Sequence, residues 1–192
     1  SVVLGDVDGD GDLDLVAGNY GGTNKLYLNN GTSVNGGFPD SSVAGTPIGS
    51  DTDDTTSVVL GDVDGDGDLD LVAGNESGTN KLYLNDGTSK GTWGGFPNSS
   101  AAGTAIGSDS DDTYSVVLGD VDGDGDLDLV AGNDGTNKLY LNNGTSVNGG
   151  FPDSSVAGTA IGSDTDYTQS VVLGDVDGDG DLDLVAGNDG TN

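Results

Sequence analysis

The sequence of 192 residues contains no cysteine, methionine, histidine or arginine. Without cysteine or histidine, the chain has no disulfides, thiol chemistry, imidazole catalysis or soft-metal sites. Positive charge is also scarce, since four lysines stand against 34 acidic residues and the formal net charge is −30. So much negative charge argues against DNA, RNA or an anionic membrane surface as a direct partner. No apolar run reaches the length of a membrane span, so direct membrane insertion is not expected.

Most of the acidic charge lies in one nine-residue stretch that reads Asp-Val-Asp-Gly-Asp-Gly-Asp-Leu-Asp. Its four identical copies hold 20 of the 34 acidic residues and begin at Asp6, Asp62, Asp120 and Asp175. Each copy lies within a longer invariant block, and the blocks begin at Ser1, Ser57, Ser115 and Ser170. This spacing divides the chain into residues 1–56, 57–114, 115–169 and 170–192. We therefore expect three full repeats and a partial fourth repeat that contains the first hairpin only.

Within each repeat, short apolar segments predict four strands and no helix. Residues 1–5 and 13–17 of the first repeat flank the aspartate stretch, so we expect them to pair as a hairpin. The two glycines of the stretch permit the turn that points the carboxylates inward. In residues 24–29, leucines alternate with lysine, tyrosine and asparagine, which predicts a half-buried third strand. A fourth strand is expected at residues 44–49, around Ile48.

Two aromatic positions recur in every full repeat. The tyrosines of the third strand are expected to pack between sheets, and they are Tyr27, Tyr83 and Tyr140. The phenylalanines of a Gly-Gly-Phe-Pro segment are expected to fill the core, and they are Phe38, Phe96 and Phe151. Four strands in about 56 residues is the size of a propeller blade, and such a small sheet cannot bury both faces alone. The predicted fold class is therefore all-β, with tandem four-stranded antiparallel blades of the β-propeller type.

The aspartate stretch has the composition of a calcium loop. Crowded carboxylates select a hard cation, and Ca²⁺ tolerates an irregular oxygen shell better than Mg²⁺ does. Side chains at the first, third and fifth positions can converge, the backbone carbonyl of the seventh can add an oxygen, and the ninth can close the shell. We expect one Ca²⁺ per loop and four in the chain. The candidate ligands are Asp6, Asp8, Asp10, Asp12 and Asp14; Asp62, Asp64, Asp66, Asp68 and Asp70; Asp120, Asp122, Asp124, Asp126 and Asp128; and Asp175, Asp177, Asp179, Asp181 and Asp183.

The position of the closing aspartate distinguishes this loop from an EF-hand, which needs a bidentate glutamate at position twelve and a helix on each side. Here the twelfth position is Ala17, in a predicted strand, and the closing aspartate is the ninth. The pattern D-x-D-x-D-G-x-x-D followed by Leu-Val-Ala-Gly resembles the calcium loop of FG-GAP repeats in integrin α-subunit propellers and of the related VCBS repeats in bacterial surface proteins. The resemblance implies a calcium-stabilised β-propeller, usually of seven blades, that lies outside the cell and has no catalytic residue.

Three and a half repeats are too few for such a ring, so we expect part of a longer array or an open or inter-chain-completed assembly. Two classes of function remain open. The first is a calcium-stabilised structural or adhesive module, extracellular or at a bacterial cell surface, that self-associates as a building block of an adhesin or a filament. The second is a propeller module that binds carbohydrate or a surface protein through loops that differ between repeats, such as residues 34–36 and the loop with Trp93.

The near-identity of the repeats favours the structural class, because a recognition site usually requires one blade to diverge. An enzyme is not expected, since catalytic carboxylates need different environments across a cleft and four identical loops offer none. The five carboxylates of a metal-free loop repel one another, so metal-binding energy is expected to act as folding energy. Matches to the N-glycosylation pattern are expected to arise by chance, and they begin at Asn30, Asn75, Asn98 and Asn143.

Overall fold

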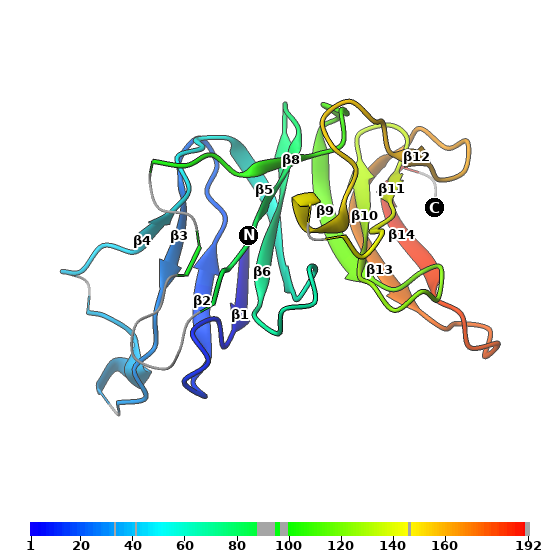
Figure 1. Cartoon of the computed structure of the whole chain (residues 1–192). Coiled ribbons are helices and arrows are strands. Elements are labelled where there is room, and N and C mark those ends of the chain that lie inside the picture. Colours follow the sequence, from blue (N-terminus) through cyan, green and yellow to red (C-terminus); the bar gives the residue numbers. More distant parts are fainter. Residues whose placement is uncertain (33, 41, 88–94, 97–99, 146, 191–192) are drawn as a thin grey trace.

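A computed structural model of the chain describes residues 1–32, 34–40, 42–87, 95–96, 100–145 and 147–190. This part of the protein is all-β apart from two short 3-10 turns, η1 (Val34–Gly37) and η2 (Val147–Gly150). None of its helical segments has the length and apolarity that crossing a membrane requires. The strands form antiparallel sheets whose order follows the sequence, which confirms the predicted fold class (Figure 1).

Three four-stranded sheets are followed by a two-stranded hairpin. The first sheet contains β1 (Val2–Gly5), β2 (Asp14–Ala17), β3 (Asn24–Tyr27) and β4 (Thr46–Ile48). The second contains β5 (Asp54–Gly61), β6 (Asp70–Glu76), β7 (Asn80–Tyr83) and β8 (Thr104–Ile106). The third contains β9 (Thr113–Gly119), β10 (Asp128–Asn133), β11 (Lys138–Tyr140) and β12 (Thr159–Ala160). The hairpin contains β13 (Tyr167–Gly174) and β14 (Asp183–Asp189).

The first strands of the later sheets begin ahead of the invariant block, because a buried threonine extends the pairing there. In β5 this residue is Thr55, whose hydroxyl donates to Asn75 Oδ1 at 2.8 Å. Thr113 makes the same contact with Asn133 in the third sheet, also at 2.8 Å. Because the first strand begins early, only a short acidic segment separates it from the fourth strand of the preceding sheet.

The sheets stack side by side through their first strands, so that β1, β5, β9 and β13 are neighbours in turn (Figure 1). A serine at the start of the block connects successive first strands. The hydroxyl of Ser57 accepts the N–H of Val116 at 3.1 Å, and the hydroxyl of Ser115 accepts the N–H of Val171 at 3.1 Å. This is the arrangement of propeller blades, and the described sheets form an open array and not a closed ring.

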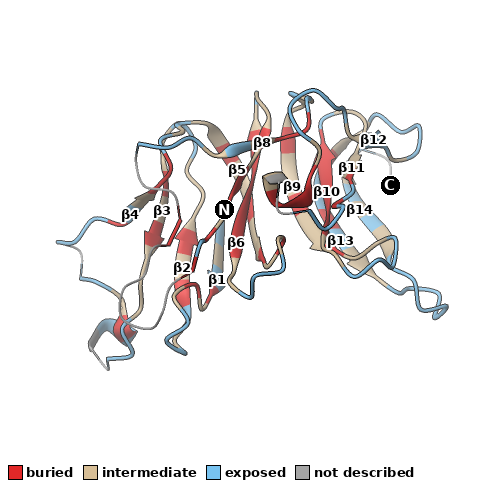
Figure 2. Ribbon diagram, viewed as in Figure 1, coloured by how far each residue is buried: buried red, intermediate tan, exposed pale blue. Residues whose placement is uncertain are grey.

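The apolar core lies between the sheets. Val16, Leu26 and Ile48 of the first sheet cluster with Leu71 and Tyr83 of the second. Equivalent residues of the second and third sheets form the next cluster, which includes Val72, Leu82, Ile106, Leu129 and Tyr140. Figure 2 shows the buried residues on the stacked sheets and exposed residues along the hairpin β13–β14. These two interfaces between neighbouring sheets therefore repeat the same packing.

Burial of the third strand depends on its place in the array. In β3, buried and partly exposed residues alternate, as predicted. In β7, Asn80, Leu82 and Tyr83 are all buried, so the prediction of half-burial is wrong for this strand. Neighbouring sheets cover both faces of β7, whereas the alternation pattern assumes that one face of the strand is exposed to solvent. The predicted packing of Tyr83 and Tyr140 between sheets is confirmed.

The two other predicted core positions are also visible. Ile48 and Ile106 lie in the fourth strands and are 1% exposed, which confirms that strand and its anchor in the first two sheets. In the third sheet the corresponding Ile161 follows β12 and is only partly buried. Phe96 and Phe151 are buried as predicted. Phe38 is only partly buried, because it lies on the face of the first sheet that has no neighbouring sheet among the described residues.

Candidate cation sites in the aspartate loops

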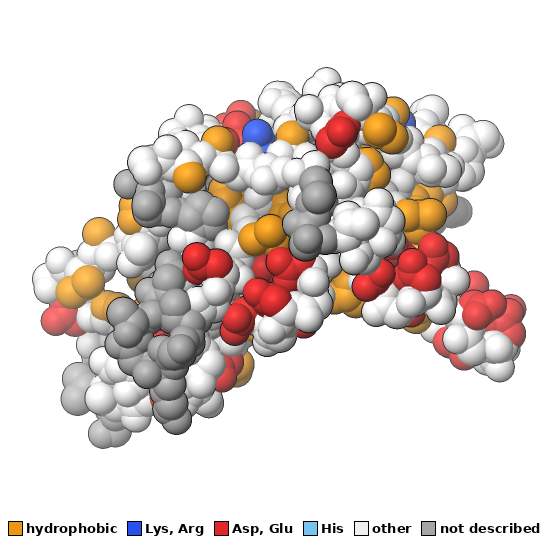
Figure 3. Space-filling model, viewed as in Figure 1, with side chains coloured by type: hydrophobic (Ala, Val, Ile, Leu, Met, Phe, Trp, Pro, Cys, Tyr) orange, Lys and Arg blue, Asp and Glu red, His pale blue; other side chains and the backbone are white. Residues whose placement is uncertain are grey.

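Each aspartate loop joins the first strand of a sheet to the second, so the stacking of the sheets brings all four loops to one side of the array. Figure 3 shows the acidic side chains gathered in clusters along this lower side, with apolar side chains above and between them. The large negative charge of the chain is thus concentrated at the loop ends of the strands.

Glycine gives the loop its shape. Gly9 and Gly11 have φ angles of +71° and +97°, and the equivalent glycines of the other three loops also have positive φ. These left-handed conformations are favourable only for a residue without a Cβ. The predicted turn is therefore present, and it directs carboxylates on alternate residues toward the inside of the loop.

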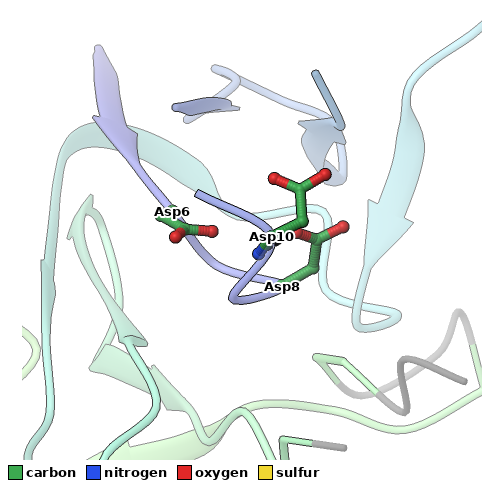
Figure 4. Close-up of side chains that lie close together, drawn as sticks. All are labelled: Asp6, Asp8 and Asp10. Carbon is green, nitrogen blue, oxygen red and sulfur yellow. Dashed lines mark hydrogen bonds between the residues drawn. The ribbon is translucent and has the colours of Figure 1, made fainter. Parts of the chain in front are cut away.

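Three carboxylates converge in every loop. In the first loop, Asp6, Asp8 and Asp10 each place one oxygen within 4.8 Å of the others (Figure 4). In the second loop the same positions converge, and they are Asp62, Asp64 and Asp66. In the third and fourth loops the ninth position replaces the fifth, and the groups are Asp120, Asp122 and Asp128, and Asp175, Asp177 and Asp183. The first and third positions therefore contribute in all four loops.

In the three four-stranded sheets, the aspartate at position nine is buried at the start of the second strand. The carboxylate of Asp70 accepts the N–H of Val63 at 2.9 Å and the N–H of Asn85 at 2.8 Å, which ties the loop to the third strand. Burial raises the pKa of Asp70 to about 7, although these two hydrogen bonds act in the opposite direction. Asp14 and Asp128 accept the equivalent pairs of N–H groups.

The aspartate at position seven turns away from the converging carboxylates. The carboxylates of Asp12, Asp68 and Asp126 lie against glycines of the turn after the third strand, and these glycines are Gly31, Gly87 and Gly144. A side chain on any of the three glycines would collide with the carboxylate. The side chain at position seven thus supports the turn, and only its backbone carbonyl is available to the loop interior.

The donor set fits a hard cation. Asp6 Oδ1 is buried and, among the described residues, has no hydrogen-bond partner. Burial, followed by the charge of Asp10, raises the pKa of Asp8, and the equivalent causes raise the pKa of Asp64. A bound cation would satisfy the unpaired oxygen and remove the repulsion that opposes ionisation. All converging groups offer oxygen atoms, the ligands that Ca²⁺ prefers.

Sequence reasoning missed the asparagine that follows the third strand. Asn85 is completely buried, and its Nδ2 donates to the carbonyl of Val7 in the preceding aspartate loop at 2.9 Å and to Leu69 O at 3.2 Å. Asn142 likewise donates to Val63 O at 2.7 Å. Alternation placed this residue on the outer face of a strand, but that face meets the neighbouring sheet. Its constant position in every repeat was the available signal.

These observations define a tandem array of propeller-type blades with an oxygen-donor loop between the first and second strand of each blade. The sequence profile of the FG-GAP-like repeat matches residues 6–73, 62–131 and 120–186. The chain therefore belongs to the FG-GAP-like repeat family. No curated protein sequence matches it.

Two solved structures align with the chain. A lectin of Agrocybe aegerita, described as recognising non-reducing terminal N-acetylglucosamine, aligns with a TM-score of 0.58 and 21% identity over 97% of this chain and 46% of the lectin chain. The biofilm matrix protein Bap1 of V. cholerae aligns with a TM-score of 0.43 and 18% identity over 96% of this chain and 27% of that chain. The chain thus spans less than half of either protein. The likeness to the lectin shows a shared fold.

Proposed function

We propose that the chain is an extracellular, non-enzymatic structural or adhesive module in which each aspartate loop holds one Ca²⁺ and in which copies of the chain associate. The observation that carries the proposal is the convergence of three carboxylates in all four loops. In each of the three complete blades, the buried aspartate at position nine ties the loop to the rest of the sheet.

Calcium would act as a structural ligand in this module. A site that is saturated at about 100 times its dissociation constant stabilises the fold by about 2.7 kcal/mol. Four sites would therefore supply a large part of the 5–15 kcal/mol that is typical of a whole domain. Extracellular calcium modules bind at about 0.1–1 mM, a concentration range that suits a protein outside the cell.

The proposal is tested by thermal unfolding and calorimetric titration. Chelation with EGTA is expected to melt the β-structure seen by circular dichroism, and Ca²⁺ is expected to restore it and to bind at four sites per chain. Equal Mg²⁺ is the control and should give a smaller shift of the midpoint, because it demands a stricter octahedral shell. A thermal midpoint that does not change between EGTA and Ca²⁺ would defeat the proposal.

A second candidate function, carbohydrate binding, is supported by an open cleft of about 460 Å³ at the other end of the first strands from the aspartate loops. Tyr20, Tyr114 and Tyr167 line this cleft together with Gln169. The rings of Tyr114 and Tyr167 lie 4.4 Å apart at an angle of 40°. A hydrogen bond from Tyr20 to Glu76 raises the pKa of the Tyr20 hydroxyl. Aromatic rings beside polar groups are typical of a ligand cleft.

The sequence adds to this second candidate, because the cleft gathers positions at which the repeats differ. Tyr114 corresponds to Thr56 and Gln169 in the other repeats, and Tyr20 corresponds to Glu76. A glycan array with the wild type and Tyr114→Ala tests it, with Trp93→Ala as a comparison because Trp93 lies outside the described residues. Binding that is lost only in Tyr114→Ala supports the cleft. Loss only in Trp93→Ala, or no binding by the wild type, contradicts it.

A further inference from the structure

The sheets interlock through a glycine and two leucines. A Cβ placed on Gly61 would lie 2.8 Å from Leu118 Cδ1 and 3.0 Å from Leu127 Cδ1 of the next sheet. The first distance is shorter than real Cβ contacts and the second is tighter than most of them, so the leucines occupy the space that the missing side chain leaves. Gly61 is the last residue of β5. Because it has no side chain, the leucines of the following sheet can lie directly against the strand.

The same contact occurs three times in the chain. At Gly5 the partners are Leu60 and Leu69, at 2.7 and 2.9 Å from the Cβ position. At Gly119 they are two leucines of the terminal hairpin, Leu173 and Leu182, at 2.7 and 3.0 Å. Each sheet thus has a glycine face toward its successor and a leucine face toward its predecessor.

The glycine and the leucines of this contact are also present at the two ends of the array. There, neither contacts the other. Gly174 is the fourth copy of the glycine, and no atom lies within 4 Å of its Cβ position. Leu4 and Leu13 are the first-repeat copies of the two leucines, and each is 55% exposed. The described residues therefore leave one glycine face and one leucine face uncovered.

The apolar residues beside these two positions are also far more exposed than their copies at the internal interfaces. Val185, beside the open glycine face, is 49% exposed, whereas its second-repeat copy Val72 is completely buried. Val2, beside the open leucine face, is 66% exposed, whereas its copy Val58 is 7% exposed. Copies of the residues that are buried at each internal interface are thus exposed at both ends of the described array (Figure 2).

We propose that the terminal hairpin β13–β14 of one copy binds the first sheet of a second copy, with Leu4 and Leu13 seated over Gly174. The occupant is a second copy because this chain carries the complementary face, with the residues that form its own internal interfaces. Ser170 then accepts the N–H of Val2 from the other copy, as Ser57 accepts that of Val116. The inference rests on the proposed function and specifies how the module self-associates.

Such an interface joins two different surfaces, so a pair of bound copies still has one free glycine face and one free leucine face. Repetition gives a ring if the rotation between copies closes and a filament if it does not. Because each copy carries a formal charge of −30, association requires that Ca²⁺ or salt neutralise the loops that the interface brings together.

The experiment compares molecular masses of the 192-residue chain in saturating Ca²⁺ by sedimentation velocity, at about 0.1 mM protein. The wild type is expected to associate, and Gly174→Val is expected to be monomeric and as stable as the wild-type monomer, since its new side chain meets no atom of its own chain. Gly22→Val is the matched control, because a Cβ there also meets nothing and Gly22 lies on a turn away from both faces.

A mixing experiment tests the pairing of unlike faces. Leu13→Asp disables the leucine face and Gly174→Val disables the glycine face, so neither variant should associate alone. An equimolar mixture should form a 1:1 dimer through the two intact faces. A monomeric wild type, association that survives Gly174→Val, or a mixture that stays monomeric would overturn the proposal. Thermal midpoints of the same samples with and without Ca²⁺ test the proposed calcium function separately from these masses.

Discussion

Aspartates within one loop have different roles because of where their side chains point. Asp6 and Asp8 face the other carboxylates, Asp12 lies against the turn after the third strand, and Asp14 is buried where the second strand begins. All carry the same formal charge, so composition alone does not separate them. The direction of each Cα–Cβ bond along the loop is what gives these aspartates different roles.

The first prediction concerns cation affinity. Asp8→Asn removes one of the converging carboxylates and is expected to weaken one site about tenfold or more, so that calorimetric titration detects three strong sites and one weak one. Asp12→Asn is the matched control in the same loop. Its side chain lies outside the converging group, so the affinity of all four sites should stay close to that of the wild type. An equal loss in both variants would contradict the assigned geometry.

The second prediction concerns the buried aspartate. Asp70→Asn keeps the shape of the side chain but offers one acceptor oxygen to two N–H groups, those of Val63 and Asn85. A buried donor without a partner costs about 1–3 kcal/mol, and we expect that loss in urea unfolding at saturating Ca²⁺. Asp68→Asn should change the free energy of unfolding by no more than about 0.5 kcal/mol. Equal stability of the two variants would refute the bridging role of Asp70.

At the scale of elements, the third strand connects neighbouring sheets through the asparagine that follows it. Asn85 bonds to carbonyls of two successive aspartate loops, those of Val7 and Leu69. In the first sheet, within the part of the chain that the structure describes, the equivalent Asn29 donates only to Leu13 O of its own loop, at 3.1 Å. The strands of a blade thus set the spacing of the loops as well as the core between sheets.

The third prediction uses this difference. Asn85→Ala removes hydrogen bonds to two loops and is expected to destabilise the protein by about 2–3 kcal/mol, while Asn29→Ala should cost about 1 kcal/mol. Urea unfolding of both variants at saturating Ca²⁺ provides the measurement. If Asn29→Ala proves as damaging as Asn85→Ala, the link between neighbouring sheets contributes little to stability.

At the scale of the whole molecule, one side of the array carries most of the negative charge and opposes its own compact state (Figure 3). Apolar contacts between sheets act against this repulsion, and the proposed cations in the loops would add to them. We therefore expect the stability of the array to depend strongly on the ions around it.

The fourth prediction follows from that charge. Without Ca²⁺, raising NaCl from about 0.01 M to about 1 M shortens the screening length from about 30 Å to about 3 Å. The thermal midpoint of the calcium-free protein should rise with salt. The calcium-loaded protein is the control, and its midpoint should rise less because bound cations already neutralise the loops. A calcium-free midpoint that falls or stays constant would show that repulsion between loops is not limiting.

Local patterns in the sequence were sufficient to predict the strands and the loops. An aspartate at every second position between two apolar segments predicts a hairpin that gathers oxygen atoms, and glycines with positive φ at Gly9 and Gly11 match that prediction. Fourfold repetition predicts stacked blades, because a small sheet must bury its faces against copies of itself. The sequence also predicted that position seven would contribute its backbone carbonyl, which agrees with the outward turn of its side chain.

Only the tertiary structure decided which residues lie opposite one another across neighbouring sheets. Contacts between residues about one repeat apart bury Tyr83 and Asn85 and place Leu118 over Gly61. The two end faces are unpaired because such contacts are missing there. The periodicity of a strand indicates which residues share a face of its own sheet, but it does not indicate what packs against that face. The sequence by itself therefore determined the repeat and its oxygen-donor loop, because both are set by neighbouring residues. The residues that meet between stacked sheets, and the complementary ends that the stacking leaves, were decided by packing between segments that are distant along the chain.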